Sequence, residues 1–338
     1  MQKTLATLIV ATLIFVGCKP STQPYSKIEG AMLGTNLRVV ADVECPPSEF
    51  YAAAMRLDSI FKSEMSLFDP DSQLNRINRG ESDSLSPGIA YNLHLSDSVS
   101  RISSGAYDIT VAPLVKALGF GAESDQQQHP NIDSILEFVG YQKINVVGNR
   151  LIRQDIRTQI DLNSIAKGYV VDRLGELTTE LGAKNFMVDI GGEIVCRGVN
   201  PYGDPWRIGI ESPFDGNMSN GDYLQKRLAI APDSPFRAMA TSGNYRRYYL
   251  DDEGNKVAHT IDASTGRSKL SSLLSVTVIA PTCALADAYG TMFMALGSDA
   301  AIEMAEQLVD AEVYFIFDDG QGGYREYLSE EMRSLVIE

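Results

Sequence analysis

The sequence predicts an α+β fold in which mixed sheets pack against helices within a single large domain. Two kinds of segment occur along its 338 residues. Runs of alternating apolar residues are typical of strands, and runs with apolar residues three and four positions apart are typical of helices. The two kinds do not alternate regularly, as they would in a parallel βαβ fold. Because the sequence has neither an internal repeat nor a clean domain boundary, we expect two intimately packed halves.

The N-terminal segment 1–17 resembles an export signal. Lys3 provides a short basic start, residues 5–16 are apolar, and Gly17 and Cys18 follow. The apolar run is shorter than the roughly 20 residues that a transmembrane helix needs. A run ending in Val-Gly-Cys resembles a bacterial lipoprotein signal, whose cysteine becomes the acylated first residue. We therefore expect a lipoprotein signal peptide over 1–17 and a lipid such as palmitate on Cys18. An ordinary secretory signal is the alternative.

Residues 18–27 are polar and contain proline, which predicts a tether before a domain that spans 28–338. A strand with a hairpin partner is expected over 28–43. The next helix begins near Ser48, because apolar residues then recur at helical spacing as far as Met65. The later elements expected in this half are a turn at Asp69-Pro70, helices over 87–104 and 132–138, and an exposed loop over 121–131.

A helix with one buried face is expected over about 166–181, where small or apolar residues recur at spacings of three and four. Asn163 or Ser164 can cap its start, and Gly182 can close it. Lys167 lies in its first turn, where the helix dipole disfavours a cation. A bound phosphate would reverse this, since the lysine and the exposed backbone N–H groups would share one anion. A solvated lysine on an ordinary core helix is the alternative.

The remainder of the chain is rich in strands. Residues 284–296 predict another helix, closed by Gly297, and Ser298 can cap one more. The expected strands of this part span 143–147, 151–153, 186–190, 206–211, 227–231, 239–250, 256–261, 274–279 and 312–317.

The strong negative charge limits the possible partners. The net charge is −15, and loss of residues 1–17 would remove only Lys3. Such an acidic protein is poorly suited to bind nucleic acid or anionic lipid through its overall field. Any phosphate must instead be held by a local set of donors or by a metal. The cysteines at 45, 196 and 283 have no CxxC spacing, which argues against a disulfide framework and a structural zinc site.

Two motifs carry side chains suited to catalysis. Asp287 and Thr291 are four residues apart, so they lie on one helix face and offer two hard oxygen donors of the kind that Mg²⁺ prefers. The alternative is an acidic first-turn residue followed by a threonine bonded back to its own helix. His259 follows a strand and precedes a turn rich in Asp, Ser and Gly, where it can serve as a general base. A structural histidine bonded to the turn backbone is equally compatible with this pattern.

Eight motifs in order resemble the ApbE family of FAD:protein FMN transferases. They cover essentially the whole domain from about residue 28 onward. Each motif is modest alone, but the complete set at family-like spacing is specific. The motifs are MLGT, EMSLFDPDSQLNRIN, GAYDITVAPL, DLNSIAKGYVVD, DIGGE, ATSGNYRRY, HTIDASTG and SVTVIAPTCALADAYGT.

The resemblance implies an ApbE-like, T-fold-related domain that binds FAD and Mg²⁺. Family members transfer FMN from FAD to a threonine or serine hydroxyl of an acceptor protein and release AMP. The resemblance implies that His259 assists deprotonation of this hydroxyl. It places the metal between Asp287, Thr291 and backbone carbonyls near Ser164 and Ala284. The residues implied to contact FAD are Met32, Phe68, Ala106, Tyr107, Asp108, Asp161, Lys167 and Ile261.

Several positions depart from the usual family pattern. Ile109 and Ala263 stand where proline is common, which could loosen a turn. Glu193 stands where aspartate is frequent after the paired glycines, which leaves its role open. Two other functions remain compatible: an FAD pyrophosphatase that uses water as acceptor, and a non-enzymatic periplasmic FAD-binding lipoprotein. By family analogy, the acceptors are subunits of membrane redox complexes, and the enzyme is exported and lipid-anchored on the periplasmic side.

Overall fold

A computed structural model gives the fold, and it describes residues 25–121, 130–213, 224–243, 248–250, 256–258, 260–269 and 271–337. The segment 1–17, Cys18 with most of the expected tether, and His259 lie outside the described residues, so what was expected of them stays a prediction. Among the described residues, no helix has both the length and the apolar character that crossing a membrane requires.

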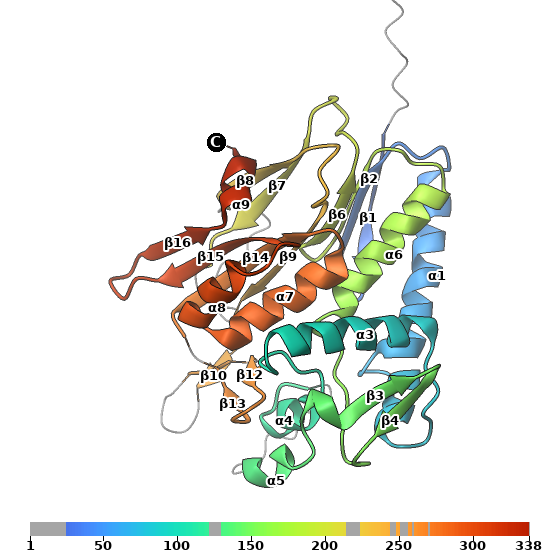
Figure 1. The fold of residues 1–338 in the computed structure, drawn as a ribbon. Coiled ribbons are helices and arrows are strands. Elements are labelled where there is room, and N and C mark those ends of the chain that lie inside the picture. The colour runs from blue at the N-terminus through green and yellow to red at the C-terminus, as the bar shows by residue number, and fades with distance from the viewer. Residues whose placement is uncertain are drawn as a thin grey trace, which may run out of the picture.

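The centre of the fold is an eight-stranded sheet in which every neighbouring pair is antiparallel (Figure 1). Its central strands are buried on both faces, because their alternate side chains enter two different cores. In the order of the sheet, the strands are β1 (Ser26–Met32), β2 (Thr35–Ala41), β5 (Phe186–Ile190), β6 (Glu193–Arg197), β9 (Ala238–Gly243), β14 (Leu273–Ala280), β15 (Glu312–Asp318) and β16 (Tyr324–Leu328).

The sheet consists of two halves with the same arrangement. In the first half, β1 and β2 precede helix α6 (Ala166–Glu180), and β5 and β6 follow it. In the second half, β9 and β14 precede helix α7 (Cys283–Leu296), and β15 and β16 follow it. The halves join where Ile194 pairs with Met239 and Val195 pairs with Ala238. The expected α+β domain of two intimately packed halves is therefore confirmed, although the sequence itself shows no repeat.

Helices cover one face of the sheet and a smaller sheet covers the other (Figure 1). Strand β15 shows both environments, since Phe315 packs in the core with the helices and Ile316 packs in the core with the smaller sheet. The smaller sheet has the order β17 (Val336–Ile337), β8 (Leu224–Ile230) and β7 (Trp206–Glu211). The remaining helices are α1 (Pro47–Met65), α2 (Gln73–Asn78), α3 (Pro87–Ile102), α4 (Ala112–Ala117), α5 (Ile132–Leu136), the 3-10 turn η1 (Tyr141–Lys143), α8 (Ser298–Ala305) and α9 (Glu330–Leu335).

Short hairpins complete the described part of the fold. They are β3 (Ile144–Val147) with β4 (Arg150–Arg153), β10 (Tyr248–Leu250) with β11 (Lys256–Ala258), and β12 (Ile261–Asp262) with β13 (Arg267–Ser268). The single strand expected over 239–250 is therefore wrong: it is two strands, β9 and β10, in different sheets. The strands β6 and β16 and the helices α2, α4 and α9 were not expected from the sequence, because each spans only five or six residues.

The expected caps of three helices are wrong. Helix α1 begins at Pro47, and Gly297 rather than Ser298 is the N-cap of α8. Helix α6 begins after Ile165 and has no side-chain cap. The physical reason lies in the preceding turn, where the Ser164 hydroxyl bonds to a tyrosine hydroxyl instead of its own backbone. The end of α6 is as expected, since Gly182 has a positive φ of 92° there.

Candidate active site

The N-terminal ends of α6 and α7 are in very close contact. A Cβ atom on Gly168, in the first turn of α6, would lie 2.3 Å from the carbonyl oxygen of Cys283, at the start of α7. It would also lie 2.8 Å from the backbone nitrogen of Ala284. Such distances leave no room for a side chain, so glycine at 168 permits the approach. The two segments that the sequence singled out for phosphate and metal binding therefore meet in space.

At this contact, each helix places one carboxylate against backbone N–H groups of the other helix. Asp287 of α7 accepts a hydrogen bond from the backbone N–H of Gly168 through Oδ2, at 2.9 Å. Asp172 of α6 accepts hydrogen bonds from the backbone N–H groups of Cys283 and Ala284, at 2.8 and 2.9 Å. Each carboxylate thus lies at the N-terminus of the other helix, where the helix dipole favours negative charge.

Burial disfavours the charged forms of these carboxylates. It raises the pKa of Asp287, and it raises the pKa of Asp172 to about 6 despite the two backbone hydrogen bonds. Glu193, at the start of β6, is buried as well, and its pKa is also raised by burial. The site therefore concentrates acidic groups that a cation would stabilise.

Lys167 supplies one such cation. Its Nζ lies 2.5 Å from Oε2 of Glu193. Burial lowers the pKa of Lys167, but the nearby carboxylates of Glu193 and Asp287 outweigh this and raise the pKa overall. In this structure the lysine pairs with a protein carboxylate, and the Gly168 N–H binds Asp287. The start of α6 therefore binds a side-chain carboxylate in this structure, and the phosphate suggested by its sequence stays a prediction.

The predicted flavin-binding segments 106–108 and 161–167 are bonded to each other. The Tyr107 hydroxyl lies 2.9 Å from Ser164 Oγ and 3.3 Å from Ser96 Oγ. The backbone N–H of Asp161 donates to the carbonyl of Ile109 at 2.8 Å. These contacts fix the turn that leads into α6, next to the carboxylates described above.

Asn78 of α2 also holds this turn in place. Its side chain accepts from the backbone N–H of Ile160 at 2.8 Å and donates to the Ile160 carbonyl at 2.9 Å. This pair of bonds imitates the pairing of a β-strand, and it is made by a buried amide. The position of Asp161, one residue later, therefore depends on α2.

The other predicted FAD contacts lie in varied surroundings. Phe68 is 74% exposed, whereas Met32 and Tyr107 are buried at 1% and 2% exposure. Asp108 is buried and accepts hydrogen bonds from the backbone N–H groups of Thr110 and Tyr141. Ala106 is half-buried, and Ile261 lies buried in β12, which contacts α7. Their contacts with FAD stay predictions.

The proposed metal donors fit a magnesium ion. Asp287 is buried beside the backbone of α6, and Thr291 lies one turn further along α7 and is half-buried. Within the described residues, no group of three or more His, Cys, Asp or Glu side chains could hold a metal. The proposed donors are one carboxylate, that of Asp287, together with neutral oxygens from Thr291 and the backbone of Ser164 and Ala284. That set suits Mg²⁺, which keeps several waters and binds substrate phosphates.

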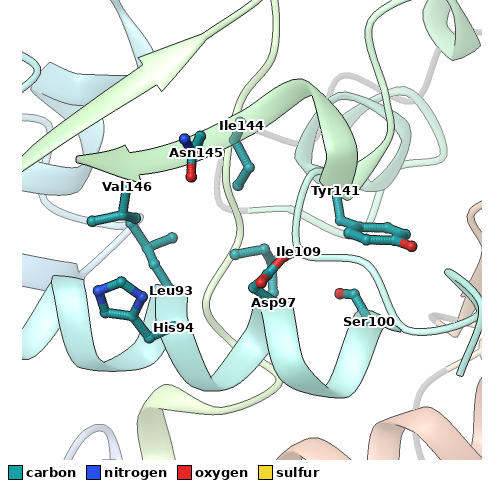
Figure 2. A pocket seen from close by; sticks show the side chains of 9 residues that line it. All are labelled: Leu93, His94, Asp97, Ser100, Ile109, Tyr141, Ile144, Asn145 and Val146. Carbon is teal, nitrogen blue, oxygen red and sulfur yellow. The ribbon is translucent and has the colours of Figure 1, made fainter. Parts of the chain in front are cut away.

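A separate cavity of about 40 Å³ lies between α3 and β3 (Figure 2). Leu93, His94, Asp97 and Ser100 of α3 line one side, and Ile144, Asn145 and Val146 of β3 line the other. Sites for drug-sized ligands usually have volumes of roughly 300–1,000 Å³. This cavity is therefore too small for FAD, and none of the predicted site residues lines it.

Sequence reasoning missed Asp172 and left the role of Glu193 open. Asp172 closes the motif DLNSIAKGYVVD, and aspartate is unfavourable inside a helix. That mismatch was the available signal. The partners of both residues come from distant parts of the chain, which no local pattern indicates.

Comparison with known proteins places the chain in a family. The sequence model of the ApbE family matches residues 33–315. The chain is 31% identical to the FAD:protein FMN transferase of Escherichia coli strain K12, over 99% of this chain and 97% of that protein. It is 32% identical to the FAD:protein FMN transferase of Haemophilus influenzae, over 95% of each.

Two solved structures have the same fold. The flavin transferase ApbE from Vibrio cholerae superposes with a TM-score of 0.80 at 28% identity, covering 92% of this chain and 100% of that one. The apo form of the Pseudomonas stutzeri flavinyl transferase ApbE gives a TM-score of 0.81 at 26% identity, with coverages of 92% and 96%. The fold, the paired helix N-termini and these likenesses lead to one conclusion: the chain belongs to the ApbE family.

Proposed function

We propose that this chain is an FAD:protein FMN transferase, which moves FMN from FAD to a threonine or serine hydroxyl of an acceptor protein and releases AMP. The observation that carries the proposal is the junction of α6 and α7, where Asp287 is buried against the N-terminus of α6. A protein that only stored flavin would not need a buried carboxylate at this junction. The names of the full-length relatives support the same activity.

The reaction exchanges one phosphoester bond for another. The acceptor oxygen forms a bond to the phosphorus of the FMN half, and the bond between that phosphorus and the bridging oxygen breaks. AMP leaves with the bridging oxygen, and the proton of the acceptor hydroxyl passes to a base. The flavin ring is carried through without a change of redox state.

Magnesium, when bound, would neutralise the diphosphate and stabilise the leaving AMP. Asp287, Thr291 and the backbone carbonyls of Ser164 and Ala284 would hold it. Gly168 keeps one oxygen of Asp287 engaged through its N–H, which limits the rotation of the carboxylate. The ion pair of Lys167 and Glu193 lies next to these proposed metal donors, and Lys167 would contact FAD from this position.

His259 is the proposed base for the acceptor hydroxyl. In the sequence it stands two residues before β12, and β12 contacts α7, which carries Asp287. A histidine has an ordinary pKa of about 6.5, so its neutral form is available near pH 7. The remaining FAD contacts would come from Met32, Phe68, residues 106–108, Asp161 and Ile261.

Export and lipid anchoring belong to the same proposal. The segment 1–17 would direct the protein across the membrane, a lipid on Cys18 would anchor it on the periplasmic side, and residues 18–27 would act as the tether. The acceptors would be subunits of membrane redox complexes that face the same compartment.

One assay tests the function. The protein is incubated with FAD, Mg²⁺ and a candidate acceptor domain, and the acceptor is then weighed by intact mass spectrometry. A gain of one FMN on a threonine or serine, with AMP in equal amount, supports transfer. Free FMN and AMP with an unmodified acceptor would show a pyrophosphatase instead, and unchanged FAD would show a binding protein.

A further inference from the structure

Side chains accept hydrogen bonds from the first three backbone N–H groups of α7. The carboxylate of Asp172 accepts from the first two, those of Cys283 and Ala284. The hydroxyl of Thr282, the N-cap residue, accepts from the third, that of Leu285, at 3.4 Å. The direction in which α7 leaves the junction is thus fixed by a residue of α6.

The positions of these residues along their helices match. Gly168 and Asp172 are four residues apart on α6, and Cys283 and Asp287 are four residues apart on α7. Residues at this spacing share one face of a helix. One face of each helix therefore carries a backbone contact and a carboxylate, and the two faces meet. Moving the start of α7 would move Asp287 with it.

Keeping an aspartate at 172 has a cost for the fold. Aspartate is a poor helix former, and Asp172 lies inside helix α6, where it works against the local helical preference. Residues that work against local stability are often found where function needs them.

We infer that Asp172 is a positioning residue, which fixes the N-terminus of α7 and so orients Ala284 and Asp287 toward the cation of the active site. The inference rests on the proposed magnesium site, and it gives Asp172 no contact with substrate. Groups that orient metal ligands typically change metal affinity or activity 10–100-fold when they are replaced. Substitution of Asp172 should therefore weaken cation binding by roughly this factor.

The test measures cation affinity directly in the full chain. Mn²⁺ binding, as a stand-in for Mg²⁺, is titrated by calorimetry and by electron paramagnetic resonance in wild type, Asp172→Asn and Asp172→Ala. Asparagine keeps one acceptor oxygen but presents an NH₂ group to the second amide, while alanine removes both acceptors. Ser86→Ala is the matched control, because Ser86 caps a different helix, α3, by accepting from the N–H of Ile89.

The expected result is a 10–100-fold weaker Mn²⁺ affinity in both Asp172 variants, with unchanged affinity in Ser86→Ala. FAD affinity measured without metal should stay within about twofold of wild type, and a high Mg²⁺ concentration should restore part of the transfer rate. Wild-type Mn²⁺ affinity in a folded Asp172 variant would overturn the inference, even if its melting temperature fell.

A second measurement needs no variant. In the wild-type protein, Mn²⁺ should slow hydrogen exchange at the amides of Cys283 and Ala284, because a cation on Asp287 holds the junction closed. Unchanged exchange at saturating Mn²⁺ would contradict a positioning role. Failure of the function would look different: wild type would bind Mn²⁺, the Asp172 variants would bind it weakly, and none would transfer FMN.

Discussion

Replacing Gly168 with alanine is the most direct test of the helix junction. The new methyl group would lie 2.3 Å from the Cys283 carbonyl oxygen and 2.6 Å from its carbonyl carbon. Both atoms belong to the backbone of α7, so neither can rotate away as a side chain could. A carbon and a carbonyl oxygen in contact lie about 3.3 Å apart or more. The start of α7 must therefore move by about 1 Å.

The energetic effect has two parts of opposite sign. Overpacking of this kind typically costs about 1–3 kcal/mol. Alanine gains back up to about 1 kcal/mol, because it is a better helix former than glycine. With the full helix-forming gain of alanine, we expect a net loss of about 0–2 kcal/mol in the free energy of unfolding. The effect on the reaction should be larger, since a shift of 1 Å in a catalytic group can slow a reaction about 100-fold.

Thermal unfolding, Mn²⁺ titration and the FMN transfer assay measure these effects. Gly175→Ala is the matched control in the same helix. Its methyl group would meet the Val195 side chain at 2.9 Å, and a side chain can shift. This control should keep wild-type cation affinity and transfer. If Gly168→Ala also kept wild-type stability, cation affinity and transfer rate, the close approach of α6 and α7 would be irrelevant to the site, and the reasoning would be refuted.

Four other substitutions test single residues. Asp287→Ala should abolish Mn²⁺ binding and magnesium-dependent transfer, and residual transfer that still requires Mg²⁺ would place the metal elsewhere. His259→Ala should slow transfer by about 10²–10⁴-fold without weakening FAD binding; a parallel loss of FAD affinity would argue against a base. Lys167→Met leaves the buried Glu193 carboxylate unpaired, and we expect a loss of about 1–3 kcal/mol in chemical denaturation, below the roughly 3–5 of a fully buried pair because the lysine side chain is 37% exposed. The double variant with Glu193→Gln should recover part of that loss, and no recovery would mean that the two side chains are not coupled. Asn78→Ala should destabilise the protein by about 1–3 kcal/mol, because it leaves the buried backbone groups of Ile160 unpaired, and should also raise the KM for FAD; an unchanged KM would show that the turn before Asp161 holds without it.

The long elements of the fold could be predicted because their signals are local. The apolar spacing over 166–181 and 284–296 marks the buried faces of α6 and α7, and short, nearly continuous apolar runs over 186–190 and 312–317 mark two strands of the central sheet. The caps were less predictable. Asn163 or Ser164 was expected to cap α6, but α6 has no side-chain cap, and the Ser164 hydroxyl bonds to Tyr107, which lies 57 residues earlier. A hydroxyl that could cap a helix can also bond to other groups. A partner that is distant in the sequence cannot be predicted from the residues around the cap.

By itself, the sequence determined the α+β class, the family and most of the candidate residues, because residue type and order suffice for each. Only the tertiary structure decided how these residues work together. It paired Lys167 with Glu193, brought Asp287 to the amide of Gly168, and revealed Asp172 at the start of α7. These contacts join residues up to 119 positions apart, and they depend on a helix crossing that allows no side chain at 168. Their geometry is set by how the two halves of the sheet pack, which no local pattern in the sequence contains.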